Sequence, residues 1–413
     1  MKVLVLGHTA ELGGAEIGMV SMARYLPADV RVVLLEDGPL VGRLRAVGAA
    51  VEVCELNAAL RAPRRIPCEL ARYGRALAAL RRTILDEVAR HGADVVLLNT
   101  LRIARLAAAC ALPRRVRCVT MLRDGLRPPH ISRWDAVVDQ VAVNAVSCAV
   151  VANSAWTRGQ LVTSRPTSVV PPFVAAGFFA TPLAPRADPD ELRVLMLGRM
   201  ARWKGQLLGL RALAACRTPR RLAVTVAGGT WFGETGHQDK IRRFAREHPE
   251  LHVDVAGHVD EVVELIDRHD VLLHTSLMPE PFGQVIVQGM ARGRIVVAAD
   301  RGGPAEVIRS GRDGLLYRMG SEDDLTRTLE QVAADAPELA AVRTNAVRSA
   351  QEYHPERTAA RLRDALDEVV GATSRGRSRP RPEYSARCSA SPTSCACCSP
   401  APHPAESVSR PAP

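Results

Sequence analysis

Short apolar segments alternate with longer helix-period segments along most of this chain, and this alternation constrains the fold more than any other feature. Residues 1–7 form a continuous apolar run that ends in glycine, as a buried parallel strand would. A glycine-bearing turn and a helix-period segment at 17–26 follow. Further strands are expected at 30–35, 51–53, 94–98, 118–122, 149–152, 193–197, 222–227, 252–255, 271–274 and 295–298. This order predicts βαβ units and an α/β fold with doubly wound parallel sheets.

A proline-rich passage divides this pattern into two halves. The chain has 413 residues, enough for two or three domains. The density of prolines from Pro171 to Pro189 excludes a helix or a central strand there. The predicted organisation is a domain at 1–175, a Pro-rich linker at 176–190, a second domain at 191–353, a closing helix at 354–371 and a disordered low-complexity tail at 372–413.

Neither a membrane span nor a signal peptide is expected. No uninterrupted apolar stretch reaches the roughly 18–20 residues that a span needs. The best candidate, 136–152, contains Asp139, Gln140 and Asn144. Glycine and glutamate follow the first apolar run too soon for a signal peptide. We expect a cytoplasmic protein and leave open a peripheral position at the inner face of the membrane.

The formal net charge of +11 leaves more than one kind of partner open. Only three of the 55 basic residues are lysines, and arginines concentrate in the first half and in the tail. A biased, solvated surface accounts for this pattern, and so does attraction to an anionic acceptor or an anionic membrane. Nucleic acid is not expected, because aromatic residues make up only 4% and no nucleic-acid-binding motif appears.

The sequence gives little sign of a metal site. Six of the ten cysteines are scattered singly, as small buried apolar residues are, and the four in the tail lack paired histidine spacing. The short Asp-x-Asp at 188–190 lies in the predicted linker. We therefore expect no metal and no other cofactor.

Of the first two glycine-bearing turns, the second carries residue types that suit a diphosphate. In the turn after the strand at 193–197, Arg199 and Lys204 lie five residues apart, each beside a glycine, between a strand end and a helix. Two cations over one patch suit a diphosphate, and a lysine is rare in this chain. An ordinary solvated helix start would show the same pattern. The first turn, Gly13-Gly14 after the strand at 1–7, can equally be an ordinary tight turn.

A third turn, at 279–291, joins carboxylate, proline and glycine. Its two prolines restrict the loop, and Gly283 begins an apolar helix whose first amides can face a phosphate. Glu280 and Gln288 lie eight residues apart, so both can address one ligand. A fourth glycine-rich turn follows at 300–316.

Taken in order, these turns resemble the signature of the family 4 glycosyltransferases of the GT-B fold. The GGAE loop at 13–16, the VANSAWTRGQL segment at 151–161 and VVPPF at 169–173 extend the resemblance to residues 1–370. It implies two Rossmann-like doubly wound parallel-sheet domains facing a cleft. It also implies a metal-independent, retaining, hexosyltransferase-type enzyme of carbohydrate biosynthesis that uses a nucleotide-diphosphate sugar as its donor.

The resemblance assigns roles to particular residues. Arg199 and Lys204 match the pair that clamps the diphosphate, and Glu280 matches the first Glu of the Glu-x7-Glu motif, which contacts sugar hydroxyls. The catalytic candidates are Arg199, Lys204, Glu280 and Asp124. The nucleotide-sugar-binding candidates are Gly14, Phe282, Gly283, Gln284, Gln288, Val259 and Arg123.

Two residues depart from the family pattern. Gln288 replaces the second Glu of the motif, and an amide accepts fewer hydrogen bonds from ribose than a carboxylate does. Many members have His-Asp where this chain has Arg123-Asp124. Arg123 cannot act as a base but can hold an anionic acceptor or a phosphate, and Asp124 can orient or deprotonate the acceptor hydroxyl.

The expected function is therefore retaining sugar transfer to a hydroxyl of a glycan, a lipid-linked sugar or a small metabolite. Front-face substitution, in which the leaving phosphate oxygen takes the acceptor proton, is the mechanism we favour. The alternatives are a nucleotide-sugar-binding protein with degraded catalysis, a sugar-nucleotide epimerase and a sugar phosphorylase. Uridine, guanosine and adenosine donors share these turns, so the base stays open.

Overall fold

The computed structural model describes residues 1–61, 67–181, 190–230, 235–334 and 337–374. Residues 182–189 of the predicted linker and the predicted tail beyond residue 374 lie outside these ranges. Residues 1–373 form one compact unit, which contains two parallel sheets.

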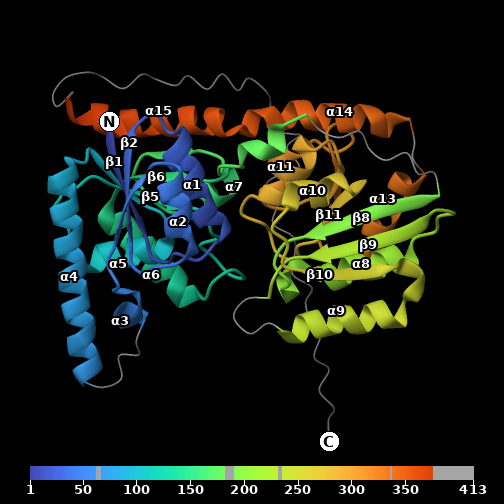
Figure 1. Ribbon diagram of the computed structural model, residues 1–413, viewed down its shortest axis with the longest axis horizontal. Coiled ribbons are helices and arrows are strands. Elements are labelled where there is room, and N and C mark those ends of the chain that lie inside the picture. The colour runs from blue at the N-terminus through green and yellow to red at the C-terminus, as the bar shows by residue number, and fades with distance from the viewer. Residues whose placement is uncertain (62–66, 182–189, 231–234, 335–336, 375–413) are drawn as a thin grey trace, which may run out of the picture. The chain divides into compact units, whose positions relative to one another are not determined.

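The first sheet has seven parallel strands in the order β3-β2-β1-β4-β5-β6-β7. Figure 1 labels β1, β2, β5 and β6 of this sheet. They are β1 (Lys2–Gly7), β2 (Asp29–Leu34), β3 (Ala50–Val53), β4 (Val95–Leu98), β5 (Cys118–Leu122), β6 (Ser147–Ala152) and β7 (Thr167–Val169). The helices of this part are α1 (Gly14–Tyr25), α2 (Pro39–Ala46), α3 (Asn57–Arg61), α4 (Pro67–His91), α5 (Leu101–Ala109), α6 (Arg133–Val146) and α7 (Ala155–Gln160).

The second sheet has six parallel strands in the order β10-β9-β8-β11-β12-β13. They are β8 (Glu191–Leu197), β9 (Arg221–Ala227), β10 (Val253–Gly257), β11 (Val271–His274), β12 (Ile295–Ala299) and β13 (Leu315–Tyr317). The helices of this part are α8 (Gln206–Ala215), α9 (Thr235–Glu247), α10 (Val262–Asp267), α11 (Gln284–Ala291), α12 (Pro304–Val307), α13 (Glu322–Ala333) and α14 (Glu338–Ala350). Short 3-10 turns are η1 (Ala176–Phe179), η2 (Arg202–Lys204), η3 (Pro249–Leu251) and η4 (Gln351–Tyr353).

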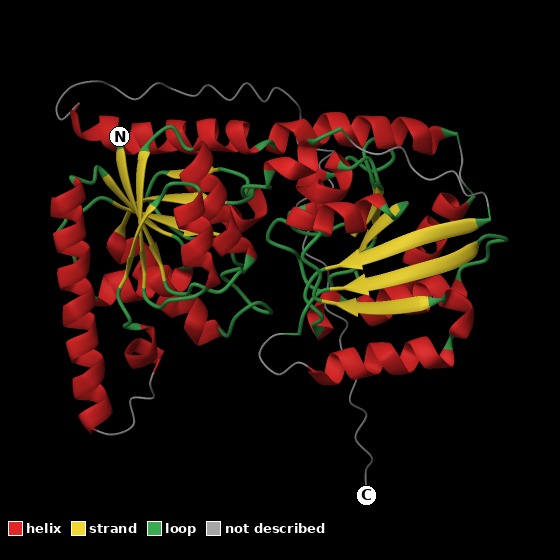
Figure 2. Ribbon diagram, in the orientation of Figure 1, coloured by secondary structure: helices red, strands yellow, loops and turns green. Residues whose placement is uncertain are grey.

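Each sheet lies between layers of helices (Figure 2). Central strands such as β4 and β12 are fully buried, because helices cover both of their faces and their sequences are apolar throughout. Every sequence-predicted strand is present, so the doubly wound parallel prediction is confirmed. The structure adds β7 and β13, which have three residues each.

The last helix, α15 (Pro355–Ser374), returns to the first sheet. Its residues Ala359, Leu362 and Leu366 belong to the same apolar cluster as Val3 and Val5 of β1. A helix is thus present where the closing helix was predicted, and it packs against β1, the first strand of the chain. No helix in the part of the chain that the structure describes is long and apolar enough to cross a bilayer.

Strand order reverses beside β1 in the first sheet and beside β8 in the second. In an open parallel sheet, the crevice at such a switch point, beyond the carboxyl ends of the strands, is the expected ligand site. The loops that follow β1, β4, β8 and β11 are therefore the places to look for function.

Candidate active site

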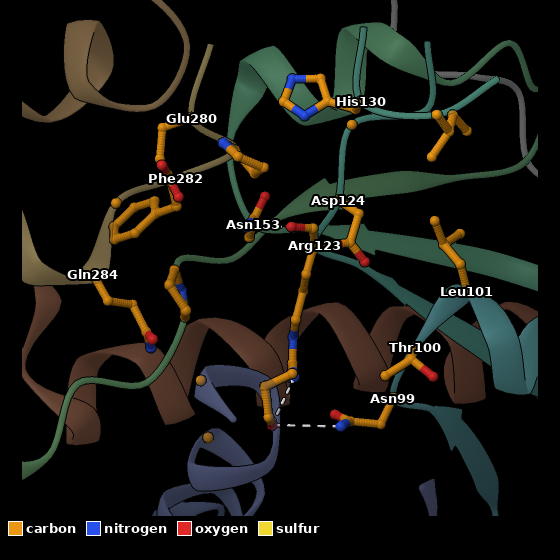
Figure 3. Close-up of a pocket in the computed structure, with 18 of the residues that line it drawn as sticks. Asn99, Thr100, Leu101, Arg123, Asp124, His130, Asn153, Glu280, Phe282 and Gln284 are labelled. Carbon is orange, nitrogen blue, oxygen red and sulfur yellow. Dashed lines mark hydrogen bonds between the residues drawn. The ribbon is translucent and has the colours of Figure 1, made fainter. Parts of the chain in front are cut away.

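A cavity of about 700 Å³ lies among these loops (Figure 3). Gly14, Thr100 and Asp124 contribute to its wall from the first sheet, after β1, β4 and β5. Arg199 and Glu280 contribute from the second sheet, after β8 and β11. Of the sequence-predicted site residues, Gly14, Arg123, Asp124, Arg199, Glu280, Phe282, Gly283 and Gln284 line this cavity.

Arg199 and Lys204 meet at the ring of Trp203. The Arg199 Cζ lies 5.6 Å from the ring centroid, and the Lys204 Nζ lies 4.2 Å from it. The Gln206 side chain donates to the Arg199 carbonyl at 2.9 Å, and the Thr275 hydroxyl donates to the Lys204 carbonyl at 3.0 Å. The turn therefore holds two cations around one aromatic ring, which brings together the two residues that the sequence paired.

Glu280 is held by three polar side chains. The Lys204 Nζ lies 2.7 Å from its Oε2, the Ser276 hydroxyl donates to the same oxygen at 3.0 Å, and His274 Nε2 lies 3.3 Å away. Burial alone would raise the pKa of Glu280, but Lys204 and His274 outweigh it and hold this pKa well below its usual range. Glu280 is therefore an ionised hydrogen-bond acceptor beside the cavity.

This pairing predicts a pH-dependent stability. Folding lowers the pKa of Glu280 below the ordinary carboxyl value of about 4.3. The pairing therefore stabilises the fold fully at pH values above about 4.3, and this stabilisation is lost as the pH falls from there toward the pKa of the folded state. Replacing Glu280 with glutamine is expected to reduce the free energy of unfolding at pH 7 by about 2–3 kcal/mol and so to lower the Tm. The difference from wild type should shrink below about pH 4.

Circular dichroism melts between pH 3 and pH 8 measure this difference. Glu368→Gln, at an exposed glutamate of α15, serves as the matched control. A Tm difference for Glu280→Gln that stays constant across this range would contradict the pairing.

The loop that carries Glu280 is fixed by backbone contacts. The Gly303 amide donates to the Glu280 carbonyl at 2.7 Å. A Cβ on Gly303 would lie 2.3 Å from the Phe282 Cα, so only glycine fits there. Gly283, with φ of +85°, caps α11, and Phe282 is buried against the Tyr353 ring, 5.6 Å between centroids. The first amides of α11 are thereby held at the edge of the cavity.

Arg123 and Asp124 occupy the opposite wall. The Arg123 guanidinium donates to the Ala15 carbonyl at 3.0 Å, and burial lowers its pKa to about 10 against the opposing effect of Glu16 and Asp124. The Asp124 side chain is exposed to the cavity, where surrounding protein atoms desolvate it and raise its pKa, although Arg123 opposes this. One edge of the arginine is thus committed to the start of α1, and the carboxyl group faces the cavity.

Three sequence-predicted residues do not line this cavity: Lys204, which reaches it only through its contact with Glu280, Gln288 and Val259. Gln288 lies about one turn into α11 and is half-buried, and Val259 packs against the apolar cluster around Phe282. Gln284 lines the cavity, and its side-chain amide donates to the Phe173 carbonyl at 2.9 Å.

Sequence reasoning missed two buried asparagines in the cavity wall. Asn99 and Asn153 follow β4 and β6, and their Oδ1 atoms have no hydrogen-bond partner among the described residues. A buried carbonyl oxygen of this kind can accept a ligand hydroxyl. Their position directly after an apolar strand was a signal that could have found them.

His130 also belongs to the cavity wall. It lies in a turn, and its side chain is half-buried against the Trp156 ring, 5.4 Å between centroids. Burial lowers its pKa, although Glu280 and Asp124 oppose this. A lone histidine in a proline-rich turn gives no sequence signal for such a position.

The two sheets' loops are also joined beside the cavity by Glu306. Its carboxylate accepts from the backbone amides of Ala155 and Trp156 at 2.8 and 2.5 Å, at the first turn of α7. The Ser154 hydroxyl donates to the Pro281 carbonyl at 2.6 Å. A carboxylate at a helix N-terminus stabilises it through hydrogen bonds and through the helix dipole.

We expect Glu306→Ala to lower the free energy of unfolding by about 1 kcal/mol, because these amides lose their acceptor. Glu306→Gln, which keeps one acceptor oxygen, should lose less. Urea unfolding measures both, and an unchanged unfolding free energy for the alanine variant would show that the contact does not form in solution.

Within the ranges that the structure describes, no group of three or more His, Cys, Asp or Glu side chains is arranged to hold a metal ion.

Comparison with known proteins finds one family model and several curated relatives that match part of this chain. Residues 183–349 match the family model described as glycosyl transferases group 1. The D-inositol 3-phosphate glycosyltransferase of Rhodococcus jostii is 29% identical over 183 residues, which cover 42% of this chain and 39% of that protein. That of Corynebacterium aurimucosum is 32% identical over 169 residues, 39% of each protein. The chain thus matches about two fifths of the length of these curated relatives.

Among solved structures, Anabaena HepE in complex with UDP and glucose has a TM-score of 0.75 and 24% identity, and the match covers 89% of this chain and 99% of that one. Sucrose-phosphate synthase of Thermosynechococcus elongatus has a TM-score of 0.73 and 16% identity, over 90% of this chain and 99% of that one. At such identities the likeness shows the fold, and membership of family 4 in particular stays a prediction. Residues 183–349 thus resemble the glycosyl transferases group 1 family, and the chain has the GT-B fold.

Proposed function

We propose that this protein transfers a sugar from a nucleoside diphosphate sugar to an acceptor hydroxyl, with retention of anomeric configuration and without a metal. The observation that carries the proposal is that Arg199 and Glu280 line one wall of the cavity, while Lys204 contacts Glu280 and shares the Trp203 ring with Arg199. Two cations and an ionised carboxylate in one place suit a ligand that has both a diphosphate and a sugar.

The donor side follows from these three residues. Arg199 and Lys204 would bind the diphosphate and stabilise the charge that develops on it as the sugar leaves. Ionised Glu280 would accept hydrogen bonds from sugar hydroxyls, and the first amides of α11 at Gly283 would face the phosphate. Protein cations thereby supply the charge that a metal ion supplies in other transferases.

The acceptor side would be the wall formed by the first sheet. Asp124 and the free oxygens of Asn99 and Asn153 can accept hydrogen bonds from hydroxyl groups. In the front-face mechanism, the bond from the anomeric carbon to the donor phosphate oxygen breaks while the acceptor oxygen bonds on the same face. The acceptor proton passes to the leaving phosphate oxygen, and Asp124 orients the hydroxyl.

The comparisons support the donor class. Crystal structures of HepE contain UDP and UDP-glucose, so a uridine donor is the first to test here. The acceptor can be a glycan, a lipid-linked sugar or a metabolite. A cytoplasmic location stays a prediction.

The test is an assay of the full chain with UDP-, GDP- and ADP-sugars, with and without EDTA, against a panel of sugar and polyol acceptors. We expect release of one nucleoside diphosphate and a product whose anomeric configuration, determined by NMR, equals that of the donor. An inverted product would contradict retention, and loss of turnover with EDTA would contradict metal independence. Nucleotide binding without turnover would favour the alternative of a binding protein with degraded catalysis.

A further inference from the structure

Helix α6 presents an apolar face to solvent. Trp134 is 81% exposed, Val137 54%, Val138 49% and Val141 63%. Residues at these spacings lie on one face of a helix. Such a face normally packs against a core, so its exposure over two turns calls for an occupant.

The segment after α7 extends this face. The Val162 amide donates to the Gln140 side chain at 2.9 Å, and the Asn144 side chain donates to the Val162 carbonyl at 3.0 Å. Val162 is itself 69% exposed. We call these five residues, Trp134, Val137, Val138, Val141 and Val162, the α6 patch.

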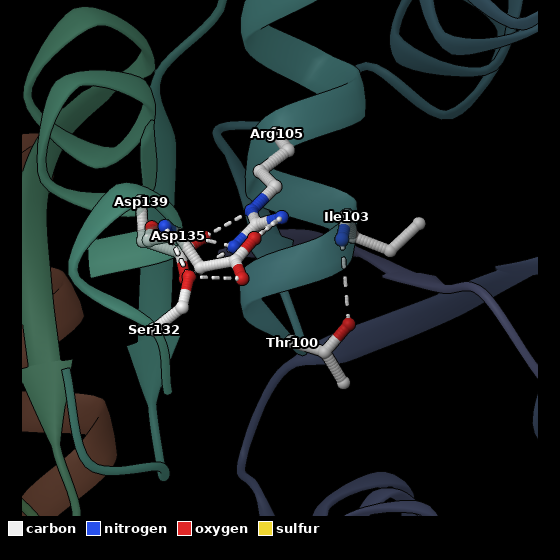
Figure 4. A network of polar contacts seen from close by, with 6 residues as sticks. All are labelled: Thr100, Ile103, Arg105, Ser132, Asp135 and Asp139. Atoms are coloured by element: carbon white, nitrogen blue, oxygen red, sulfur yellow. Dashed lines mark hydrogen bonds and ion pairs between the residues drawn. The ribbon is translucent and has the colours of Figure 1, made fainter. Parts of the chain in front are cut away.

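The charge around the α6 patch is positive. Four arginines and two aspartates lie between residues 126 and 168. Both aspartates are bound by Arg105, which donates to Asp139 at 2.8 Å and to Asp135 at 3.2 Å (Figure 4). Arg133 at the start of α6 and Arg165, whose guanidinium donates to the Asn144 carbonyl at 3.2 Å near its end, are exposed.

We propose that the α6 patch docks on an anionic lipid bilayer. Tryptophan and valine on one helix face can enter the headgroup region to a shallow depth, and flanking arginines can bind lipid phosphates. A second copy of this chain is a poorer occupant, because a two-fold contact through the patch would bring the arginine-rich rims of two copies together.

The opposite face of α6 gives this docking a consequence. Asp139, on the buried side of the helix, lines the cavity, so the helix separates the proposed membrane surface from the proposed acceptor wall. If the proposed function holds, an acceptor carried by a lipid would reach the cavity beside α6. The docking itself does not depend on that function and is measured without turnover.

Co-sedimentation of the full chain with phosphatidylcholine vesicles, with and without phosphatidylglycerol, tests the proposal. We expect binding to the anionic vesicles, weakened by raising the salt from 0.1 to 1 M. The double variant Trp134→Asp, Val138→Asp should bind at least tenfold more weakly. Arg133→Gln and Arg165→Gln should each weaken binding by about fivefold.

Leu70→Asp, at another exposed apolar residue, on α4, is the matched control and should bind as wild type does. Melting curves establish that every variant is folded. Equal binding of the patch variant and wild type would overturn the proposal, as would equal binding to vesicles with and without phosphatidylglycerol. A lipid-free dimer in sedimentation velocity that Trp134→Asp converts to monomer would assign the patch to a second copy instead.

Discussion

Lys204→Met is expected to lower kcat/KM for sugar transfer by about 100- to 1,000-fold, the usual cost of removing one group that stabilises developing charge. The Lys204 ammonium lies 2.7 Å from Glu280 and shares the Trp203 ring with Arg199. Its loss removes one of the two cations of the proposed diphosphate site. Steady-state kinetics on the best donor measure the effect.

Two further variants separate chemistry from folding. Lys240→Met, at an exposed lysine of α9, should keep wild-type kinetics. In Lys204→Met the buried carboxylate of Glu280 loses its cation, so Tm should fall. The double variant Lys204→Met, Glu280→Gln should recover part of that Tm, because no buried charge is left unpaired, and stay inactive. Activity of Lys204→Met within threefold of wild type would contradict the role of Lys204 in the diphosphate site.

Gly205→Ala is expected to displace the same turn and to lower both stability and activity. Gly205 has φ of +69°, and a Cβ there would lie 2.0 Å from the Thr275 carbonyl oxygen. Neither backbone segment can move away easily, because the Thr275 hydroxyl also donates to the Lys204 carbonyl and ties the two segments together. We expect a loss of stability well beyond the roughly 1–2 kcal/mol of a left-handed alanine alone, together with a loss of kcat/KM of at least tenfold.

Gly320→Ala isolates the backbone strain from the collision. Gly320 has φ of +79°, and a Cβ there would meet nothing within 4 Å. Its variant should lose only about 1–2 kcal/mol and keep its kinetics. Urea unfolding and kinetics compare the two variants, and equal effects of Gly205→Ala and Gly320→Ala would contradict the close approach of Gly205 to Thr275.

The strands could be predicted because each buried parallel strand reads as an apolar run. The strands β5 and β11 have the bounds expected from the sequence. The short β7 and β13 were not predicted, because three residues are too few to carry a periodic signal, even where they are apolar as in β13.

The candidate site was predictable where its residues share a turn. Arg199 and Lys204 are five residues apart, so local spacing brought them to one patch. Two other contacts depend on strand order, which sequence spacing alone does not give. Lys204 and Glu280 are 76 residues apart, and Glu306 is 150 residues from Trp156 of α7. Gln288 shows the converse, since a position eight residues from Glu280 does not line the cavity.

Calorimetric titration of the full chain with UDP, GDP and ADP, each with and without EDTA, tests the central claim most directly. We predict that one diphosphate binds with an affinity unaffected by EDTA, and that Lys204→Met weakens this binding at least tenfold while Lys240→Met does not. Absence of binding by all three, binding abolished by EDTA, or equal affinity of Lys204→Met would contradict a metal-free diphosphate site built on Arg199 and Lys204.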